Sequence, residues 1–135
     1  MRSAVSRLNA ALRARDLDGT LALFSADAIF SGSEEAEAAA GPELSVFFTR
    51  FFELPFLVSW QIGDVVARTE APYVWFLATA TLELEEGGEI ECVPYRLSGV
   101  LESTADRTLI RMLNGSEPAV VEDGWASGAS PPGEG

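Results

Sequence analysis

The sequence predicts an α+β protein, in which helices at the start of the chain are followed by an antiparallel sheet. Its 135 residues, 47% of them hydrophobic, suffice for one core and leave no room for a second domain. Apolar residues first recur at helical spacing, as in Val5, Leu8 and Leu12. From Leu57 onward they alternate along the chain, as in strands. This segregation favours helices layered on one face of the sheet.

The opening elements are predicted to be two helices and a strand. Residues 3–15 form an amphipathic helix with one buried face. Asp16 then caps a short second helix, because a carboxylate at this position accepts hydrogen bonds from the free N–H groups of the first turn. The buried face of that helix is expected to carry Leu17, Leu21 and Phe24. Asp27 turns the chain before an extended segment at 28–30, and residues 16–32 form the centre of the domain.

A loop and a third helix are predicted next. Residues 31–43 are rich in Ser, Gly and acidic residues, which is typical of a loop. No apolar wall surrounds its acidic residues, so we interpret them as a solvated surface rather than as a metal or acid–base cluster: Glu34, Glu35 and Glu37. Pro42 begins a helix that ends before Pro55. One broad face of this helix, either plain core or the aromatic wall of an apolar cavity, carries Leu44, Phe47, Phe48, Phe51 and Phe52.

The second half of the chain predicts four strands in an antiparallel meander. They are expected at 57–68, 73–85, 89–103 and 108–114, joined by short turns. Residues 1–117 then form the domain. Residues 118–135, rich in Gly, Ser and Pro, are predicted to be a flexible acidic tail.

The strand predicted at 73–85 is apolar on both sides. One side carries Tyr73, Trp75, Leu77, Thr79 and Thr81. The other carries Val74, Phe76, Ala78, Ala80 and Leu82. A sheet with one face in water would show a polar side, so we expect both faces to be covered. The second cover is either another copy of the chain, giving a homodimer, or the C-terminal tail.

The charged residues exclude several kinds of function. Nine basic residues against 21 acidic ones give a net charge of −12, which repels phosphate backbones and anionic lipid. We therefore expect no nucleic-acid or membrane partner. All basic residues are Arg, and the chain has neither Lys nor His. This excludes Schiff-base lysines, histidine bases, Ser-His-Asp triads and His-ligated metals, and we expect neither a metal nor a cofactor.

A cytoplasmic location is expected. Arginines interrupt the first sixteen residues, so the unbroken apolar core of a signal peptide is missing. The longest apolar runs fall well short of the ~20 residues that span a bilayer. Cys92, the only cysteine, precludes an intrachain disulfide and is expected to be a small buried residue rather than a nucleophile.

The segment ARDLDGTLALFSADAIF, residues 14–30, resembles the second helix and first strand of the nuclear transport factor 2-like superfamily, which includes ketosteroid isomerases and SnoaL-like proteins. The match extends from Leu8 almost to Glu117. It implies a cone-shaped, curved antiparallel sheet with about three N-terminal helices on its concave face and a pocket between them. Members of the superfamily commonly dimerise through the outer sheet face.

The same resemblance argues against the familiar chemistry of these families. At the positions where ketosteroid isomerases have a Tyr, a catalytic Asp and a second acid, this chain has Leu8, Gly32 and Arg96. Neither a proton-accepting carboxylate nor the donors that hold an enolate oxygen are present there. Many SnoaL-like sequences carry a His near the end of the last strand, where this chain has Met112, Leu113 and Asn114.

The resemblance also implies which residues line the cavity. The expected ligand-binding residues are Phe30, Phe48, Trp60, Tyr73, Trp75, Thr79, Cys92, Arg96, Met112 and Asn114. A guanidinium facing an apolar cavity needs an anion nearby, because an unpaired buried charge costs several kcal/mol. For Arg96 that anion is either an internal carboxylate, such as Glu43, Glu53 or Asp64, or the acidic group of a ligand.

Two functions are compatible with these observations. The first is a non-catalytic pocket protein that binds a small apolar molecule with an acidic group, using Arg96, Tyr73 and Asn114 as polar contacts. The second is a SnoaL-like isomerase, cyclase or dehydratase acting on a hydrophobic acid, with Asp64 or Tyr73 transferring a proton. A carboxylate inside the cavity would distinguish them, because the enzyme requires a base there.

Overall fold

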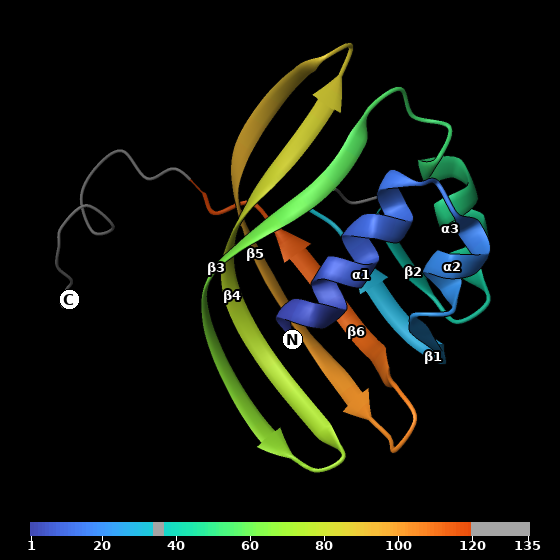
Figure 1. The fold of residues 1–135 in the computed structure, drawn as a ribbon, viewed down its shortest axis with the longest axis vertical. Coiled ribbons are helices and arrows are strands. Elements are labelled where there is room, and N and C mark those ends of the chain that lie inside the picture. Colours follow the sequence, from blue (N-terminus) through green and yellow to red (C-terminus); the bar gives the residue numbers. More distant parts are fainter. Residues whose placement is uncertain (34–36, 120–135) are drawn as a thin grey trace, which may run out of the picture.

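The computed structural model describes residues 1–33 and 37–119, and these form three helices and one sheet of six strands (Figure 1). The helices are α1 (Arg2–Arg13), α2 (Leu17–Leu21) and α3 (Glu43–Phe51). The strands are β1 (Phe24–Ser31), β2 (Ala38–Ala40), β3 (Leu57–Glu70), β4 (Tyr73–Glu86), β5 (Glu89–Ser103) and β6 (Thr108–Ser116). The predicted α+β class is confirmed. The acidic residues Glu34 and Glu35, and the predicted tail from residue 120 on, lie outside the described residues.

The sheet is mixed rather than purely antiparallel. Its strand order is β2-β1-β6-β5-β4-β3, and the predicted antiparallel meander occupies β3 to β6. β1 pairs with β6 in parallel, which the sequence did not predict. β2 is a strand of three alanines inside the predicted loop, and it forms because β1 supplies the whole of its pairing. Alanine alone has little preference for strands, which explains why this element gave no signal.

The second helix is shorter than predicted. Asp16 caps it as expected, because its side chain accepts a hydrogen bond from the N–H of Gly19. The helix ends at Leu21, however, and Phe24 is the first residue of β1. Pairing with β6 replaces further helical turns, since the N–H of Ile110 donates to the carbonyl of Leu23. The predicted turn at residue 27 is an irregularity within β1, where the pairing register shifts.

α1 lies across the sheet and is attached to β3 by side chains (Figure 1). Asn9 donates a hydrogen bond of 2.9 Å to the carbonyl of Trp60 and accepts one of 3.0 Å from its N–H. Arg2 donates to the carbonyls of Ile62 and Gly63. The apolar face of α1 is buried through Ala4, Val5, Leu8 and Leu12. None of the described helices is long and apolar enough to cross a membrane.

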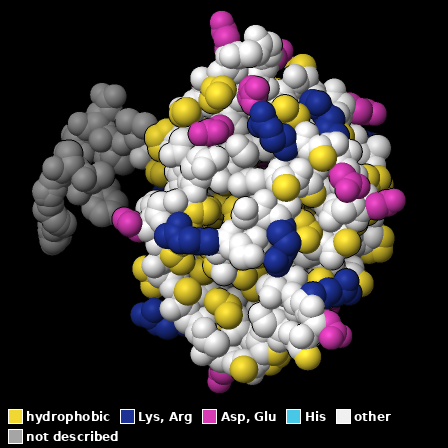
Figure 2. All heavy atoms as spheres, viewed as in Figure 1, with side chains coloured by type: hydrophobic (Ala, Val, Ile, Leu, Met, Phe, Trp, Pro, Cys, Tyr) yellow, Lys and Arg dark blue, Asp and Glu magenta, His cyan; other side chains and the backbone are white. Residues whose placement is uncertain are grey.

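Alternation along the strands gives the sheet two distinct faces. The inner face, covered by the helices, carries buried residues that include Phe76, Ala78, Tyr95, Leu97 and Leu113. The outer face carries large hydrophobic side chains that are 38–57% exposed: Ile29, Val66, Tyr73, Trp75, Leu77 and Met112. In the view of Figure 2, charged side chains of both signs are interspersed with hydrophobic ones rather than gathered in one patch.

Candidate functional site

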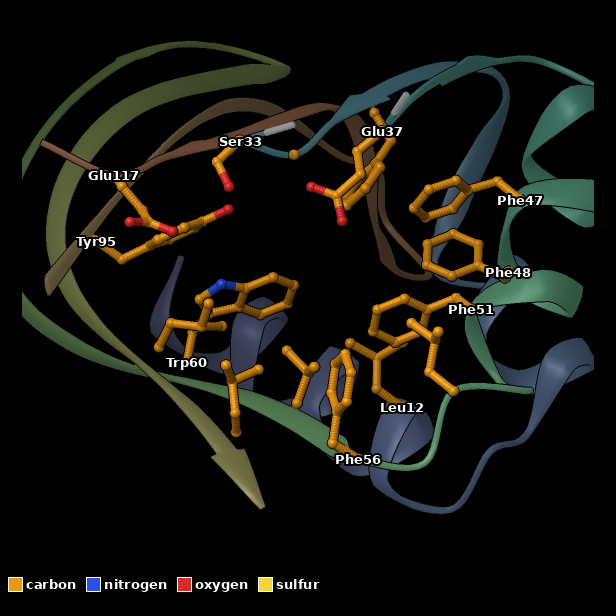
Figure 3. Close-up of a pocket in the computed structure, with 16 residues that line it drawn as sticks. Leu12, Ser33, Glu37, Phe47, Phe48, Phe51, Phe56, Trp60, Tyr95 and Glu117 are labelled. Carbon is orange, nitrogen blue, oxygen red and sulfur yellow. The ribbon is translucent and has the colours of Figure 1, made fainter. Parts of the chain in front are cut away.

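A cavity of about 150 Å³ lies between the inner sheet face and helices α1 and α3 (Figure 3). Every strand of the sheet except β2 and β6 contributes to it directly, together with the chain on either side of α3. Its lining consists of Leu12, Phe30, Gly32, Ser33, Glu37, Phe47, Phe48, Phe51, Leu54, Phe56, Val58, Trp60, Leu82, Leu84, Tyr95 and Glu117.

The apolar end of the cavity is built mainly by α3. Phe47 packs on Phe30 of β1 with ring centroids 5.1 Å apart, and it stacks on Phe51 at 6.1 Å. Phe48 is buried in the core and contacts Phe24 with centroids 5.7 Å apart. Aromatic pairs of this kind contribute about 0.5–1.5 kcal/mol beyond their buried area. Both interpretations of the predicted phenylalanine face therefore hold, because it forms part of the core and one wall of the cavity.

The opposite end of the cavity is polar. Figure 3 shows the side chains of Ser33, Tyr95 and Glu117 at this end, with the hydroxyl of Tyr95 directed toward Ser33. Glu37 lies between Ser33 and Phe47, and its carboxylate is on the side of Ser33. Trp60 lies between the two ends, and its indole nitrogen is on the side that faces Tyr95 and Glu117. This nitrogen is buried and has no hydrogen-bond partner within the described part of the chain. An unsatisfied buried donor costs about 1–3 kcal/mol, so it marks a place where an acceptor would be stabilising.

The pKa of Tyr95 is raised above its ordinary value. Burial is the largest cause, because it disfavours the charged phenolate. Hydrogen bonds with Ser33 oppose this effect, and the negative charges of Glu37 and Glu117 add to it. Gly115 of β6 leaves room for the ring, since a Cβ there would lie 2.6 Å from Cε2 of Tyr95. Tyr95 therefore presents a neutral hydroxyl to the cavity at physiological pH.

One arginine positions the loop that closes the apolar end. Arg15 follows α1 with a φ of 51°, and its guanidinium donates to the carbonyls of Phe52, Leu54 and Phe56. Leu54 and Phe56 also line the cavity. A left-handed conformation is unfavourable for a residue with a Cβ. Here the backbone hydrogen bonds that end α1, from the N–H of Arg15 to Leu12 and from the N–H of Asp16 to Ala11, stabilise it together with the guanidinium contacts. Arg15 therefore connects the end of α1 to the cavity wall.

Three of the predicted ligand-binding residues line the cavity, namely Phe30, Phe48 and Trp60. The predicted lining is wrong for the others, because the structure places them on the outer face of the sheet: Tyr73, Trp75, Thr79, Cys92, Arg96, Met112 and Asn114. Alternate residues do share a face as predicted. The face that we assigned to the cavity is, however, the outer face of the sheet.

The predicted polar contacts have other surroundings on that outer face. Arg96 is exposed, opposite Thr79 on β4, and forms no ion pair among the described residues, so its charge is solvated. Asn114 accepts a hydrogen bond of 2.5 Å from the hydroxyl of Ser31. Cys92 is exposed, in contrast to the expected buried position. The water available on this face satisfies these groups at little cost.

The proposed proton-transfer residues also lie outside the cavity. Asp64 is an exposed residue at the register shift of β3, and Tyr73 is 40% exposed at the start of β4. The polar residues that do line the cavity were missed: Ser33, Glu37, Tyr95 and Glu117. We assigned Glu37 to a solvated loop because the residues next to it in the sequence are polar or small. Its apolar neighbours in the cavity come from other elements, β1 and α3, and only the fold brings them together. Within the described residues, no group of three or more acidic or Cys side chains could hold a metal ion.

The chain is thus a small α+β domain, in which helices cover one face of a curved sheet and a cavity lies between the two layers. The chain belongs to the SnoaL-like family, because the family model for the SnoaL-like domain matches residues 1–118. The predicted resemblance is thereby confirmed. No curated protein matches the chain in sequence.

Among the solved structures that share this fold, three serve as examples. A proposed calcium/calmodulin dependent protein kinase II association domain from Xanthomonas campestris is 20% identical, with a TM-score of 0.76 over 89% of this chain and 86% of that one. A ketosteroid isomerase-like protein from Erwinia carotovora is 19% identical, with a TM-score of 0.67 over 88% and 94%. A proposed dehydratase of the NTF2-like family from Streptomyces avermitilis is 11% identical, with a TM-score of 0.74 over 88% and 94%. At such identities the likeness shows the fold alone.

Proposed function

We propose that this protein binds a small, largely apolar molecule in the cavity between α3 and the inner sheet face. The observation that carries the proposal is the two-ended lining, with phenylalanine rings at one end and a group of hydrogen-bonding side chains at the other. Apolar pockets with a few convergent polar groups are the usual form of small-molecule sites. A volume of about 150 Å³ is that of a cavity able to hold a single aromatic ring.

The argument for an acidic group on the ligand no longer holds. It rested on Arg96, which lies exposed on the outer face. Within the described parts of the chain no arginine lines the cavity, whereas Glu37 and Glu117 do. A carboxylate ligand would therefore meet like charges at the polar end, which disfavours its binding.

The proposal is tested by filling the cavity. Leu82 lines it, whereas its neighbour Thr81 points to the outer face, so Leu82→Trp and Thr81→Trp form a matched pair. We expect phenylpropanol to raise the melting temperature of wild type and of Thr81→Trp but not of Leu82→Trp, because a ligand stabilises only the protein that binds it. Native mass spectrometry of the purified protein would show any co-purifying molecule. Equal thermal shifts in all three proteins would refute binding in this cavity.

A proton-transfer enzyme is the second candidate, and the observation in its favour is a carboxylate within the cavity. Glu37 and Glu117 line the end that also holds the hydroxyl of Tyr95. A carboxylate can accept a proton from a carbon while a neutral hydroxyl stabilises the oxygen that becomes negative. Deuterium exchange next to the carbonyl of phenylbutanone, followed by NMR, tests this activity. Exchange no faster than in buffer alone would exclude it for this substrate class.

Self-association is proposed for the outer sheet face. Six large hydrophobic side chains are exposed there, and the central ones are Trp75 and Leu77, exposed by 45% and 52%. Exposed apolar patches of this kind mark interaction surfaces, and a second copy related by a twofold axis is the simplest cover for such a face. Phe76 and Ala78, in contrast, are buried on the inner face and belong to the core.

A further inference from the structure

The charged side chains that line the cavity have a single sign among the residues that the structure describes. The lining, as far as residues 1–33 and 37–119 form it, includes the carboxylates of Glu37 and Glu117 and no arginine. Both carboxylates act on the same point, because each raises the pKa of Tyr95 through its charge. The chain as a whole carries a formal charge of −12, so the surrounding field also favours cations. The acidic lining of this end therefore favours a cation over an anion.

The walls next to these carboxylates suit a cation as well. The ring of Tyr95 lines this end of the cavity, and the indole of Trp60 lies between it and the phenylalanine end. The face of an aromatic ring attracts an ammonium group, and the attraction grows when water is excluded. An ammonium ion at the polar end would thus meet carboxylates on one side and ring faces on the other, while a hydrocarbon body fills the phenylalanine end.

The indole of Trp60 gives an independent indication of a ligand at the same end. The residue is only 6% exposed, and its Nε1–H has no acceptor among the described residues. Figure 3 shows this nitrogen facing the side of the cavity where Tyr95 and Glu117 lie. Tryptophan N–H groups usually find a partner when they are buried. An acceptor oxygen on the ligand would supply the missing partner.

We propose that the ligand is a hydrophobic amine that binds as its ammonium ion and carries an acceptor oxygen near the amine. This inference rests on the proposed binding function and specifies the chemistry of its ligand. The ammonium group lies between Glu37 and Glu117, and the oxygen accepts from Nε1 of Trp60. The aromatic or aliphatic body lies against Phe47 and Phe51.

Four probes of nearly equal shape separate charge, acceptor and apolar body. Phenylpropylamine is a cation, phenylpropanol is neutral and phenylpropanoate is an anion, while phenoxyethylamine replaces one methylene of the amine by an ether oxygen. Isothermal titration calorimetry is expected to show phenylpropylamine binding roughly tenfold or more tightly than phenylpropanol, because hydrogen bonds to charged groups are the stronger ones. Phenoxyethylamine is expected to bind more tightly still, and phenylpropanoate most weakly.

Glu→Gln variants show which carboxylates cause the preference for the amine over the alcohol. Glu117→Gln and Glu37→Gln should each reduce the preference for amine over alcohol by roughly tenfold, with little change in alcohol binding. Glu53→Gln removes the same charge from an exposed residue that does not line the cavity, so it should keep the preference of wild type. The melting temperature of each variant is measured first, to show that it is folded.

The outcomes distinguish the two proposals. Equal affinity for amine and alcohol, or tightest binding of the acid, would overturn the cationic ligand and leave the cavity as a binding site. A preference for the amine that persists in both Glu117→Gln and Glu37→Gln would also overturn it. Binding of none of the four probes, or equal binding of phenylpropylamine to wild type and Leu82→Trp, would overturn both proposals.

Discussion

Asn9 makes two of the hydrogen bonds that attach α1 to β3, and Arg2 also donates to this strand, so Asn9 is a sharp point at which to perturb the fold. Its amide donates to the carbonyl of Trp60 and accepts from the N–H of the same residue, at 2.9 Å and 3.0 Å. A hydrogen bond contributes about 1 kcal/mol net, so losing both costs about 2 kcal/mol. Alanine is a better helix former than asparagine by about 0.5–0.7 kcal/mol, which offsets part of this loss.

We therefore expect Asn9→Ala to lower the free energy of unfolding by about 1.5 kcal/mol. Urea denaturation followed by circular dichroism measures the change, and an unchanged m-value would show that the unfolded state is not involved. Ser6→Ala is the matched control, because Ser6 is an exposed residue of the same helix, and it should be neutral or slightly stabilising. If Asn9→Ala falls within about 0.5 kcal/mol of Ser6→Ala, α1 is not held in the way described.

Three further predictions concern the cavity and the outer face. In a Tyr73→Phe background only Tyr95 titrates as a tyrosine, and its absorbance should show a pKa above the ordinary value that Glu117→Gln lowers. Because that pKa is raised on folding, the associated stability is complete below the ordinary tyrosine value and is lost as pH rises through the folded-state value. Arg15→Gly should change stability little, since relief of a left-handed φ of 51° offsets the lost carbonyl contacts, but hydrogen exchange at residues 52–56 should become faster. Trp75→Glu should convert a dimer to a monomer in light scattering, because it places charge in the apolar outer face.

Each of these has a result that contradicts it. A tyrosine titration midpoint at or below the ordinary value would mean that Tyr95 is not buried beside carboxylates. An unchanged rate of hydrogen exchange at residues 52–56 in Arg15→Gly would show that the guanidinium contacts do not stabilise this loop. Gln61→Glu is the control for Trp75→Glu. It adds the same charge at an exposed position of the outer face, away from Trp75 and Leu77, and should leave the dimer intact. A wild-type protein that is monomeric at micromolar concentrations would end the case for self-association through this face.

The elements of the fold were largely predictable, but the two faces of the sheet were not distinguished. In β4, Trp75 and Phe76 are neighbours of similar character, so period two assigns them to different sides without telling which side is inside. β5 did contain a marker. Arg96 stands between Tyr95 and Leu97, and a cation between two apolar residues of a strand is most simply a surface residue. The resemblance implied that Arg96 lies in the cavity. This placed the wrong face of β5 inside, and because β4 and β6 pair with β5, their inner and outer faces were exchanged as well.

Irregularities in pairing limit what alternation alone can assign. The register shifts between Val100 and Leu101, so Ile110 is buried on the inner face although Met112, two residues later, is exposed on the outer one. A similar shift occurs in β3 between Ile62 and Val65. No sequence pattern announces these shifts, because they depend on how neighbouring strands meet. The acidic end of the cavity was missed for a related reason, since Glu37 and Glu117 reach it from segments that follow β1 and β6.

The contacts of α1 with β3 have a consequence for how the protein avoids aggregation. β3 is the last strand of the sheet that the structure describes, so in this sheet the backbone groups along one of its sides have no strand to pair with. Asn9 and Arg2 bind the backbone of that strand at Trp60, Ile62 and Gly63. Open strand edges invite another molecule to extend the sheet, and side chains that bind the edge prevent this. The first helix thus protects the edge of the sheet as well as covering its core, and a partly unfolded molecule in which α1 has detached would present a template for intermolecular β-structure.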